Sequence, residues 1–424
     1  CGVCVASCPA HMDIPGYIRA VREGDLKEGL RLLYETNPFP QACGRICTHL
    51  CEAACSIGSG RNADGTPTDP VAIRWLKRYI ADQIELADYG KALPRAEAPT
   101  GNKVAIMGAG PGGLAAAYYL ALLGHGVTVF EKDEAAGGML RYGIPEYRLP
   151  YPALDKDIGW ITSLGVQIRY GKAVGKDLAL ASLYGDYDAV FLSTGLTVAY
   201  KLDVPGDSHP RVLDGVAILA AATRGEPLGL GRKVAVVGGG NVAMDAARTA
   251  LRNGAEVDIV YRRREVDMPA DPEEIMEAKA EGAILIPQAI PLEVKPAQGL
   301  DAGPDAAGKA AIKATFVWNL AEMVQKEPGK RPVPEPIPGV VVEKTYDSII
   351  AAIGQGPDLS YVAEADGIEI RRYKPVIAPD GRTSRATVFA GGDLTNDRKD
   401  AISAIADGHR AALAMDRLFA GKEA

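Results

Sequence analysis

The first 90 residues carry apolar side chains at helical spacing. In the stretches Ile14 to Leu33 and Val71 to Leu86 these side chains recur at i, i+3 and i+4, which predicts amphipathic helices. A segment rich in proline, glycine and alanine, Leu93 to Gly101, then breaks the pattern and predicts a linker. We therefore expect an all-α N-terminal domain over residues 1–95.

The pattern beyond the linker is different. Two apolar runs, beginning near Lys103 and near Arg232, each predict a strand that leads into a glycine-rich turn and a helix. Mixed sequence separates these two βαβ units. The chain is thus expected to be an α/β protein, with two doubly wound domains behind the helical one.

Composition and charge narrow the class of partner. The chain has 424 residues and a formal net charge of −7. Its only basic run is Arg262-Arg263-Arg264, which argues against nucleic acid as a partner. It has neither an apolar stretch of membrane-spanning length nor a signal peptide, so we expect a soluble, cytoplasmic protein with no membrane insertion.

Candidate chemistry begins with the cysteines, all of which lie within the first 55 residues. They are Cys1, Cys4, Cys8, Cys43, Cys47, Cys51 and Cys55. The opening C-x2-C-x3-C-P matches the end of the bacterial ferredoxin run C-x2-C-x2-C-x3-C-P. The first cysteine of that run would precede residue 1, so we expect an eighth cysteine there. Eight thiolates suit two [4Fe-4S] clusters.

The second cysteine group recurs at every fourth residue. In one straight helix its ends would lie about 18 Å apart, too far to share a cluster, so the group must bend or be divided. The ferredoxin pattern of crossing assigns Cys1, Cys4, Cys55 and the missing cysteine to one cluster. It assigns Cys8, Cys47, Cys51 and a fourth ligand to the other. Cys43 is the simplest fourth ligand.

Other uses of these cysteines fit less well. An odd count in a cytosolic type of chain disfavours a disulfide framework. A structural zinc site needs only four ligands, usually in C-x2-4-C pairs. Cys1 could be an N-terminal nucleophile, but its place in a ferredoxin run favours ligation.

The first glycine-rich turn follows the strand that starts at Lys103. Its G-x-G-x-x-G motif supplies the candidate cofactor-binding residues Gly108, Gly110, Pro111, Gly112 and Gly113. Such a turn lets a pyrophosphate approach the helix N-terminus. The next strand ends in Glu131, which is placed to accept hydrogen bonds from an adenosine ribose.

The second glycine-rich turn supplies Gly238, Gly240, Asn241, Val242 and Ala243, with alanine replacing the third glycine. Here the following strand ends in Arg262 and Arg263, where an acid is usual for NAD. Guanidinium groups suit a 2′-phosphate, so the sequence favours NADPH over NADH. The alternative is a solvated basic turn that Glu265 and Asp267 neutralise.

A third segment, Ala386 to Asp393, ends in Gly-Gly-Asp and precedes a predicted helix, Ala401 to Phe419. It resembles the second flavin motif of flavoproteins with two dinucleotide-binding domains. The resemblance implies that Gly392, Asp393 and Ala401 bind FAD, with Asp393 on the ribityl chain. Phe191 to Gly195, with Thr194, and Ile350 to Gln355, with Gly354, resemble the chain-crossing strands of that family.

These crossing strands imply that the FAD domain is interrupted. We expect it to comprise residues 102–228 and 345–424, with the NAD(P)H-binding domain at 229–344. The fold class is then α/β, with two Rossmann-like dinucleotide-binding domains, for FAD and NADP, preceded by an all-α iron–sulfur domain.

The whole chain resembles the small subunit of glutamate synthase and its relatives, which include the N-terminal half of dihydropyrimidine dehydrogenase and the large subunit of NADH-dependent ferredoxin:NADP oxidoreductase. The matching stretches, besides the FAD fingerprint, are Cys4 to Ile18, Asn37 to Cys55, Pro70 to Tyr79, Gly137 to Pro145, Gly238 to Asp245, Arg262 to Glu274 and Val388 to Asp393. The resemblance implies that NADPH passes a hydride to FAD, and that single electrons then pass through the clusters to a partner redox subunit. It also places Gly138, Met139 and Arg141 along the flavin.

The chain departs from the family at one ligand position. Where some relatives have glutamine or glutamate, this chain aligns Lys77, which is a poor ligand while charged. Cys43 therefore stays an open candidate, and Asp69 is a weaker one. Because the cofactors carry the chemistry, we nominate no side chain as a catalytic acid or base.

Two rival functions remain at this stage. A disulfide reductase of the thioredoxin-reductase type needs a cysteine pair beside the flavin, but no cysteine follows Cys55. The second rival is an electron-bifurcating or non-catalytic relay subunit of a larger complex.

Overall fold

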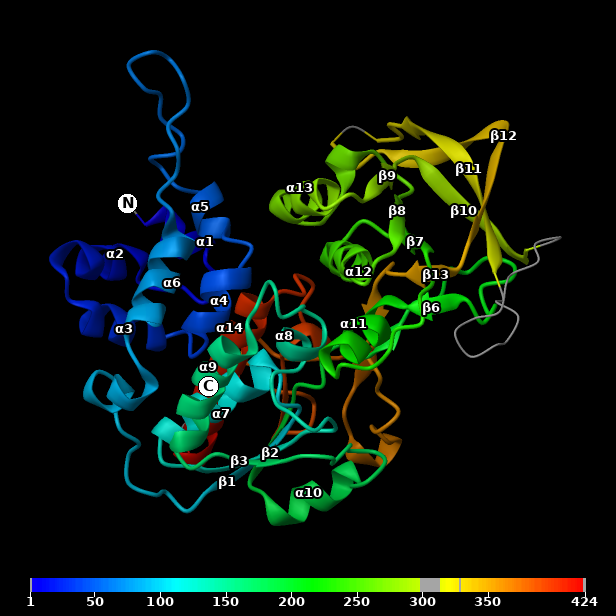
Figure 1. The fold of residues 1–424 in the computed structure, drawn as a ribbon. Helices are drawn as coiled ribbons and strands as arrows, with labels where there is room; N and C mark the ends of the chain where they lie inside the picture. Colours follow the sequence, from blue (N-terminus) through cyan, green and yellow to red (C-terminus); the bar gives the residue numbers. More distant parts are fainter. Residues whose placement is uncertain (1, 298–312, 328, 422–424) are drawn as a thin grey trace. The chain divides into compact units, whose positions relative to one another are not determined.

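The computed structural model describes residues 2–297, 313–327 and 329–421, which form two compact units (Figure 1). The first unit comprises Cys1–Arg141, Glu146–Thr197 and Pro357–Ala424, and the second comprises Tyr142–Pro145 and Val198–Gly356. Cys1, a predicted ligand, lies outside the described residues. No helix within the described residues combines the length and apolar character that crossing a membrane requires.

The N-terminal part of the first unit is helical, as predicted. Its helices are α1 (Val3–Ser7), α2 (Ile14–Glu23), α3 (Leu26–Tyr34), α4 (Pro40–Ile46), α5 (Leu50–Ala53) and α6 (Ile73–Gln83), followed by the 3-10 helix η1 (Leu86–Lys91). The predicted stretch from Ile14 to Leu33 is divided because Gly24 takes a left-handed conformation at the end of α2. Asp25 then caps α3 by accepting from the Glu28 N–H.

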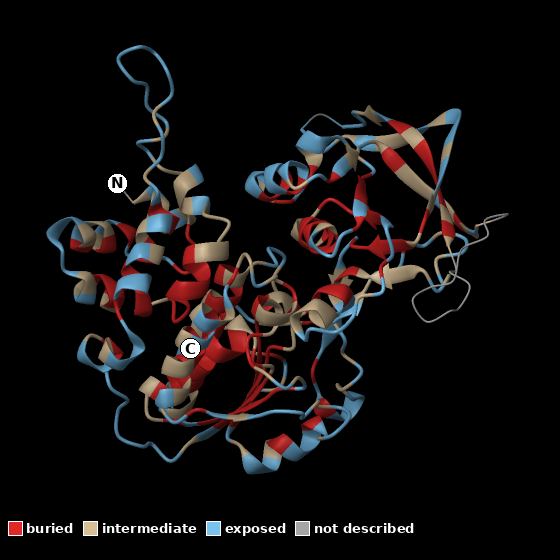
Figure 2. Cartoon of the chain, viewed as in Figure 1, coloured by how far each residue is buried: buried red, intermediate tan, exposed pale blue. Residues whose placement is uncertain are grey.

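The rest of the first unit is a parallel sheet with the strand order β17-β4-β1-β2-β3. Its strands are β17 (Val388–Ala390), β4 (Ala189–Leu192), β1 (Lys103–Met107), β2 (Gly126–Phe130) and β3 (Gln167–Arg169). Helices α7 (Pro111–Leu122) and α14 (Ala401–Phe419) pack against each other, and both are buried over most of their length (Figure 2). The unit also contains α8 (Met139–Tyr142, which ends in the second unit), α9 (Tyr151–Ser163), α10 (Leu180–Asp186), the 3-10 helices η3 (Glu364–Asp366) and η4 (Gly392–Leu394), and the short pair β15 (Ile370–Arg371) and β16 (Lys374–Pro375).

The second unit contains another parallel sheet, ordered β6-β13-β7-β8-β9, and an antiparallel one, ordered β10-β11-β12. Its strands are β5 (Val198–Ala199), β6 (Val212–Asp214), β7 (Lys233–Val237), β8 (Glu256–Val260), β9 (Ile284–Ile286), β10 (Ala289–Pro296), β11 (Ala314–Val324), β12 (Val333–Tyr346), β13 (Ser348–Ala351) and β14 (Gln355–Gly356). Its helices are α11 (Gly215–Thr223), α12 (Asn241–Arg252), the 3-10 helix η2 (Glu265–Asp267) and α13 (Pro272–Ala280).

The structure moves both expected boundaries of the nucleotide domains, at 228/229 and 344/345. Strand β13 pairs in parallel with β7 and with β6, so residues 198–228 and 345–356 belong to the second unit. The apolar run at Ile350 suits a strand in either sheet, and only its pairing with Val236 fixes which one it joins. The strands that follow the two crossing segments, β5 and β14, pair with each other.

A buried carboxylate joins the cysteine-bearing helices to the sheet-containing part of the first unit. Asp157 of α9 is fully buried, and its Oδ1 and Oδ2 accept from the backbone N–H groups of Gln41 and Ala42 at 3.3 and 3.0 Å. These are unpaired donors of the first turn of α4, which has no side-chain cap of its own. Asp157 thus caps, from a distant part of the chain, the helix that carries Cys43 and leads to Cys47.

Replacing Asp157 with alanine should therefore destabilise the chain. Two buried donors would lose their acceptor, at a cost of about 1 to 3 kcal/mol for each unsatisfied group. The measurement is thermal or denaturant unfolding, with Asp186→Asn as the control because Asp186 is exposed on α10. Equal stability of Asp157→Ala and the control would show that the cap is dispensable.

Candidate functional site

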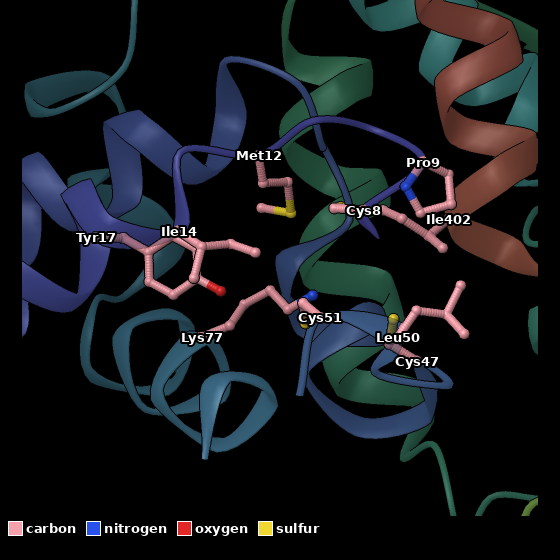
Figure 3. Close-up of a pocket in the computed structure, with 10 residues that line it drawn as sticks. All are labelled: Cys8, Pro9, Met12, Ile14, Tyr17, Cys47, Leu50, Cys51, Lys77 and Ile402. Atoms are coloured by element: carbon pink, nitrogen blue, oxygen red, sulfur yellow. The ribbon is translucent and has the colours of Figure 1, made fainter. Parts of the chain in front are cut away.

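Three cysteines meet around one cavity in the helical part of the first unit (Figure 3). Cys8 follows α1, Cys47 follows α4 and Cys51 lies in α5. The cavity is lined by Cys8, Pro9, Met12, Ile14, Tyr17, Cys47, Leu50, Cys51, Lys77 and Ile402. Sulfur donors within a largely apolar wall are the surroundings that an iron–sulfur cluster requires.

The second cysteine group bends, which is one of the two outcomes that its spacing left open. Helix α4 ends at Ile46 and α5 begins at Leu50. Between them His49 takes a left-handed conformation, with φ of 38°. Cys47 and Cys51 lie on either side of this break, and both line the cavity together with Cys8.

Cys43 lies apart from this cavity lining. It is fully buried in α4, and burial raises the pKa of its thiol well above the usual range, against the opposing effect of the Lys77 ammonium. Its role as the fourth ligand stays a prediction. Cys4 and Cys55, predicted for the other cluster, are half-buried, and α1, which carries Cys4, packs beside α5.

Lys77, which the resemblance aligned with a ligand position, lines the cavity. It lies on the buried face of α6 with Ile73 and Ile80, and only 5% of its surface is exposed. Burial lowers the pKa of this ammonium, but the neighbouring sulfurs, that of Cys47 foremost, raise the pKa by more. The structure therefore places a cation, where some relatives have a ligand, among cysteine sulfurs.

The first fingerprint turn is shaped for a closely approaching group. Gly108 has φ of 98°, and a Cβ there would lie 2.5 Å from the carbonyl oxygen of Ser193. Gly110 precedes α7, Pro111 is its first residue, and Gly112 and Gly113 are buried in its first turn. The turn thus presents backbone N–H groups at a helix start, as a pyrophosphate requires.

Glu131 follows β2 and is buried beside this turn. Its Oε2 accepts from the Ala109 N–H at 2.7 Å and its Oε1 from the Asp133 N–H at 2.9 Å. Burial raises the pKa of Glu131, and these two donors partly oppose that shift. Each oxygen keeps a lone pair for a ribose hydroxyl.

The segment that starts at Gly137 lies against the same turn. The Gly137 N–H donates to the carbonyl oxygen of Ala109 at 2.8 Å, and a Cβ on Gly138 would lie 2.9 Å from the Gly110 Cα. Met139 begins α8. Arg141 donates to the carbonyl oxygen of Ala136 at 2.7 Å and pairs with Asp155, so its guanidinium is held by the chain itself.

Asp393 is the strongest flavin-site feature. It lies in η4 after β17, and burial raises the pKa of its carboxyl to about 6. Its Oδ1 is buried, and no donor from the described residues reaches it. A buried carboxylate oxygen requires a donor, which a ribityl hydroxyl would supply. Gly392 is bonded through its N–H to Asp407, and Ala401 begins α14 directly after its cap, Asp400.

The residues of the two chain-crossing segments are divided between the two units: Thr194 and Gly195 belong to the first, and Gly354 belongs to the second. The Thr194 hydroxyl is 3.0 Å from the Tyr361 hydroxyl, and Gly195 has φ of 66°. Both follow β4 in the first unit. Gly354 lies in the second unit beside the Tyr200 ring, and its carbonyl oxygen accepts from the Tyr200 N–H at 3.0 Å.

The second glycine-rich turn repeats this plan within the second unit. A Cβ on Gly238 would lie 2.2 Å from the carbonyl oxygen of Ala352, and Gly240 precedes α12. The Asn241 side chain accepts from the Asp271 N–H at 2.8 Å. Val242 is half-buried. Ala243, which replaces the third glycine, is fully buried, so the site is restricted to a small side chain.

Of the three arginines after β8, the structure neutralises Arg264, as the alternative expected. Asp267 pairs with Arg264 at 2.8 Å, and Glu265 pairs with Lys279 at 2.9 Å. Within the described residues neither Arg262 nor Arg263 pairs with a carboxylate, and Arg263 Nε is buried without an acceptor. Both residues fit a role in binding an anion.

Sequence reasoning missed Tyr17 and Ile402 as parts of the cysteine cavity. Tyr17 lies within the helical stretch Ile14 to Leu33, whose spacing predicts a buried face but not its neighbours. Ile402 follows the predicted flavin residue Ala401, and nothing local indicates that it faces cysteines from the other end of the chain.

Two family models match the chain. Residues 1–88 match dihydropyrimidine dehydrogenase domain II, 4Fe-4S cluster, and residues 102–289 match pyridine nucleotide-disulphide oxidoreductase.

Among solved structures, FprA from Mycobacterium tuberculosis has a TM-score of 0.58 at 18% identity, over 76% of this chain and 87% of its own length. Thioredoxin reductase from Lactococcus lactis has a TM-score of 0.55 at 23% identity, over 76% of this chain and 99% of its own. The predicted fold class is thereby confirmed.

Curated relatives match nearly the whole chain. NADPH-Fe(3+) oxidoreductase subunit beta of Geobacter sulfurreducens is 37% identical over 98% of this chain and 63% of its own length. NADP(+)-dependent formate dehydrogenase subunit beta of Moorella thermoacetica is 39% identical over 98% of this chain and 59% of its own length. This chain thus spans about three fifths of these two relatives.

A third relative is covered almost completely. The glutamate synthase [NADPH] small chain of Escherichia coli is 31% identical over 96% of this chain and 87% of its own length. The resemblance inferred from the motifs is thereby confirmed, and the chain belongs to the glutamate synthase small-chain family of oxidoreductases, with an N-terminal 4Fe-4S domain and a pyridine nucleotide oxidoreductase domain.

Proposed function

We propose that this chain is an NADPH-oxidising electron-transfer subunit, in which a hydride passes from NADPH to FAD and single electrons then pass through two [4Fe-4S] clusters to a partner redox subunit. One observation carries the link between flavin and cluster. Ile402, in the first turn of α14, lines the cysteine cavity, and its neighbour Ala401 begins the helix behind the Asp393 turn. The two candidate sites therefore adjoin within one compact unit.

Residues of the first unit would contact FAD at several points along the cofactor. The turn from Gly108 to Gly113 would bind the pyrophosphate, Glu131 the ribose, and Asp393 the ribityl chain. When bound, FAD supplies the conversion between a two-electron hydride donor and one-electron clusters. The protein contributes position, burial and exclusion of water.

The second unit would bind the nicotinamide cofactor. The turn from Gly238 to Ala243 would hold the pyrophosphate, and Arg262 and Arg263 would bind the 2′-phosphate, which supports NADPH over NADH. In domain terms, residues 1–95 are the proposed iron–sulfur domain, the remainder of the first unit is the FAD domain, and Val198–Gly356 is the NADPH domain.

The partner is proposed from the chemistry and from the relatives. Three relatives carry subunit or small-chain names and are described as NADPH- or NADP-dependent. Clusters beside a flavin would carry single electrons away from it, so we propose a second redox subunit as the acceptor.

Changing Cys51 to serine should remove one of two clusters. Because Cys51 lines the three-cysteine cavity, the variant should lose about four of about eight iron atoms per flavin while FAD remains bound. The measurement is iron, acid-labile sulfide and flavin content of anaerobically purified protein that includes the residues before Cys1. Zinc as the sole bound metal would contradict the cluster proposal.

Changing Asp393 to alanine should lower FAD occupancy, because the buried acceptor for the ribityl chain is removed. The flavin content per chain, from absorbance, measures this loss. Asp397→Ala is the matched control, since Asp397 is an exposed carboxylate four residues away that pairs with Lys374. Undiminished flavin in Asp393→Ala would refute the assignment of this residue.

Changing both Arg262 and Arg263 to alanine should weaken NADPH binding far more than NADH binding. Each lost charge-assisted hydrogen bond is worth about 1.5 to 3 kcal/mol. The measurement is the concentration of each nucleotide that half-bleaches the flavin. Arg264→Ala, which removes an arginine already paired with Asp267, should leave both values nearly unchanged. Equal losses of affinity for NADPH and NADH would exclude recognition of the 2′-phosphate by these arginines. If NADPH did not bleach the flavin of the unmodified protein, the chain would instead be a relay subunit.

A further inference from the structure

Lys77 presents a problem that the proposed function does not by itself explain. It is a buried ammonium on the inner face of α6, whose other buried residues are apolar except for Arg74, and the Arg74 Nη1 donates to the Cys47 carbonyl oxygen at 3.4 Å. Within the described residues Lys77 pairs with no carboxylate. Burying an unpaired ammonium costs folding free energy, so an apolar residue at this position would be more stable unless some other group compensates the charge.

The compensating groups are on the wall of the cavity. Lys77 lines it together with Cys8, Cys47 and Cys51, and Figure 3 shows its side chain reaching into the cavity from α6. The rest of the lining is apolar apart from Tyr17. Attraction between Lys77 and anything anionic in this cavity is therefore weakly screened.

A thiolate-ligated cluster is the anion that this cavity suits. Its thiolates outweigh the positive charge of the iron–sulfide core, and one-electron reduction adds a further negative charge without breaking a bond. A fixed cation beside it stabilises the reduced form more than the oxidised form. Net charge and hydrogen bonding around a cluster are among the factors that set its reduction potential.

We propose that Lys77 is an outer-sphere positioning residue that raises the reduction potential of the cluster in the Cys8, Cys47 and Cys51 cavity and is not itself an iron ligand. This inference rests on the proposed iron–sulfur function. The cavity is also the one that contains Ile402, next to the flavin-type turn. Lys77 thereby makes the transfer of one electron from the flavin to this cluster more favourable.

The test replaces Lys77 with methionine, which keeps the length of the side chain and removes its charge, and with arginine, which keeps the charge. The two midpoint potentials of anaerobically purified protein would be followed by electron paramagnetic resonance during redox titration. Lys77→Met should lower one of them so that the equilibrium constant for its reduction falls at least tenfold, or about 59 mV for one electron. Lys77→Arg should keep both potentials near those of the unmodified protein.

Lys27→Met is the control, because Lys27 belongs to the same helical part but is exposed on α3, where water screens its charge. Iron and sulfide content separate the possible failures. If Lys77→Met keeps its full iron content and its potentials do not change, the proposal is wrong. It is also wrong if the variant loses about four irons, because Lys77 would then be a ligand or a purely structural residue. Absence of iron from the unmodified protein would instead overturn the proposed function on which the inference rests.

Discussion

Parallel pairing of β17, β4, β1 and β2 is the constraint on which the flavin-type site depends. Parallel strands present their carboxyl ends at one edge of a sheet. The Gly108 turn, Glu131, the Ser193 to Gly195 loop and Asp393 each follow one of these strands, and so they meet there although they span almost 300 residues. The Gly108 turn is so close to Ser193 that only glycine fits between them. Strand pairing thus determines the position of each functional group.

The second unit uses the same geometry for a different ligand. Its turn after β7 matches the turn after β1, and the end of β8 corresponds to the end of β2. At that end the first unit has a buried carboxylate, which accepts hydrogen bonds from two backbone N–H groups. The second unit has Arg262 and Arg263 there, and neither pairs with a carboxylate in the part of the chain that the structure describes. The proposed difference between the two dinucleotide sites thus lies in the charge at this one strand end.

The cysteine cavity follows another logic, because its residues come from the ends of short helices. These helices bury little area on their own, and Asp157 fixes α4 by accepting from two donors of its first turn. Ile402, from α14 near the other end of the chain, also lines the cavity. The position of the cysteine sulfurs thus depends on the packing of the whole first unit and less on helix propensity.

The sequence alone determined the elements and the chemistry that each carries. Strand, glycine turn and helix occur together within about 30 residues, so local patterns were enough to predict both fingerprints, Glu131 and the helix Ala401–Phe419. Tertiary structure alone decided that β13 joins the second sheet, since an apolar run fits either one until its partners are known. It also decided that Tyr17 and Ile402 line the cysteine cavity, because a helical period predicts which residues are buried but not what they are buried against.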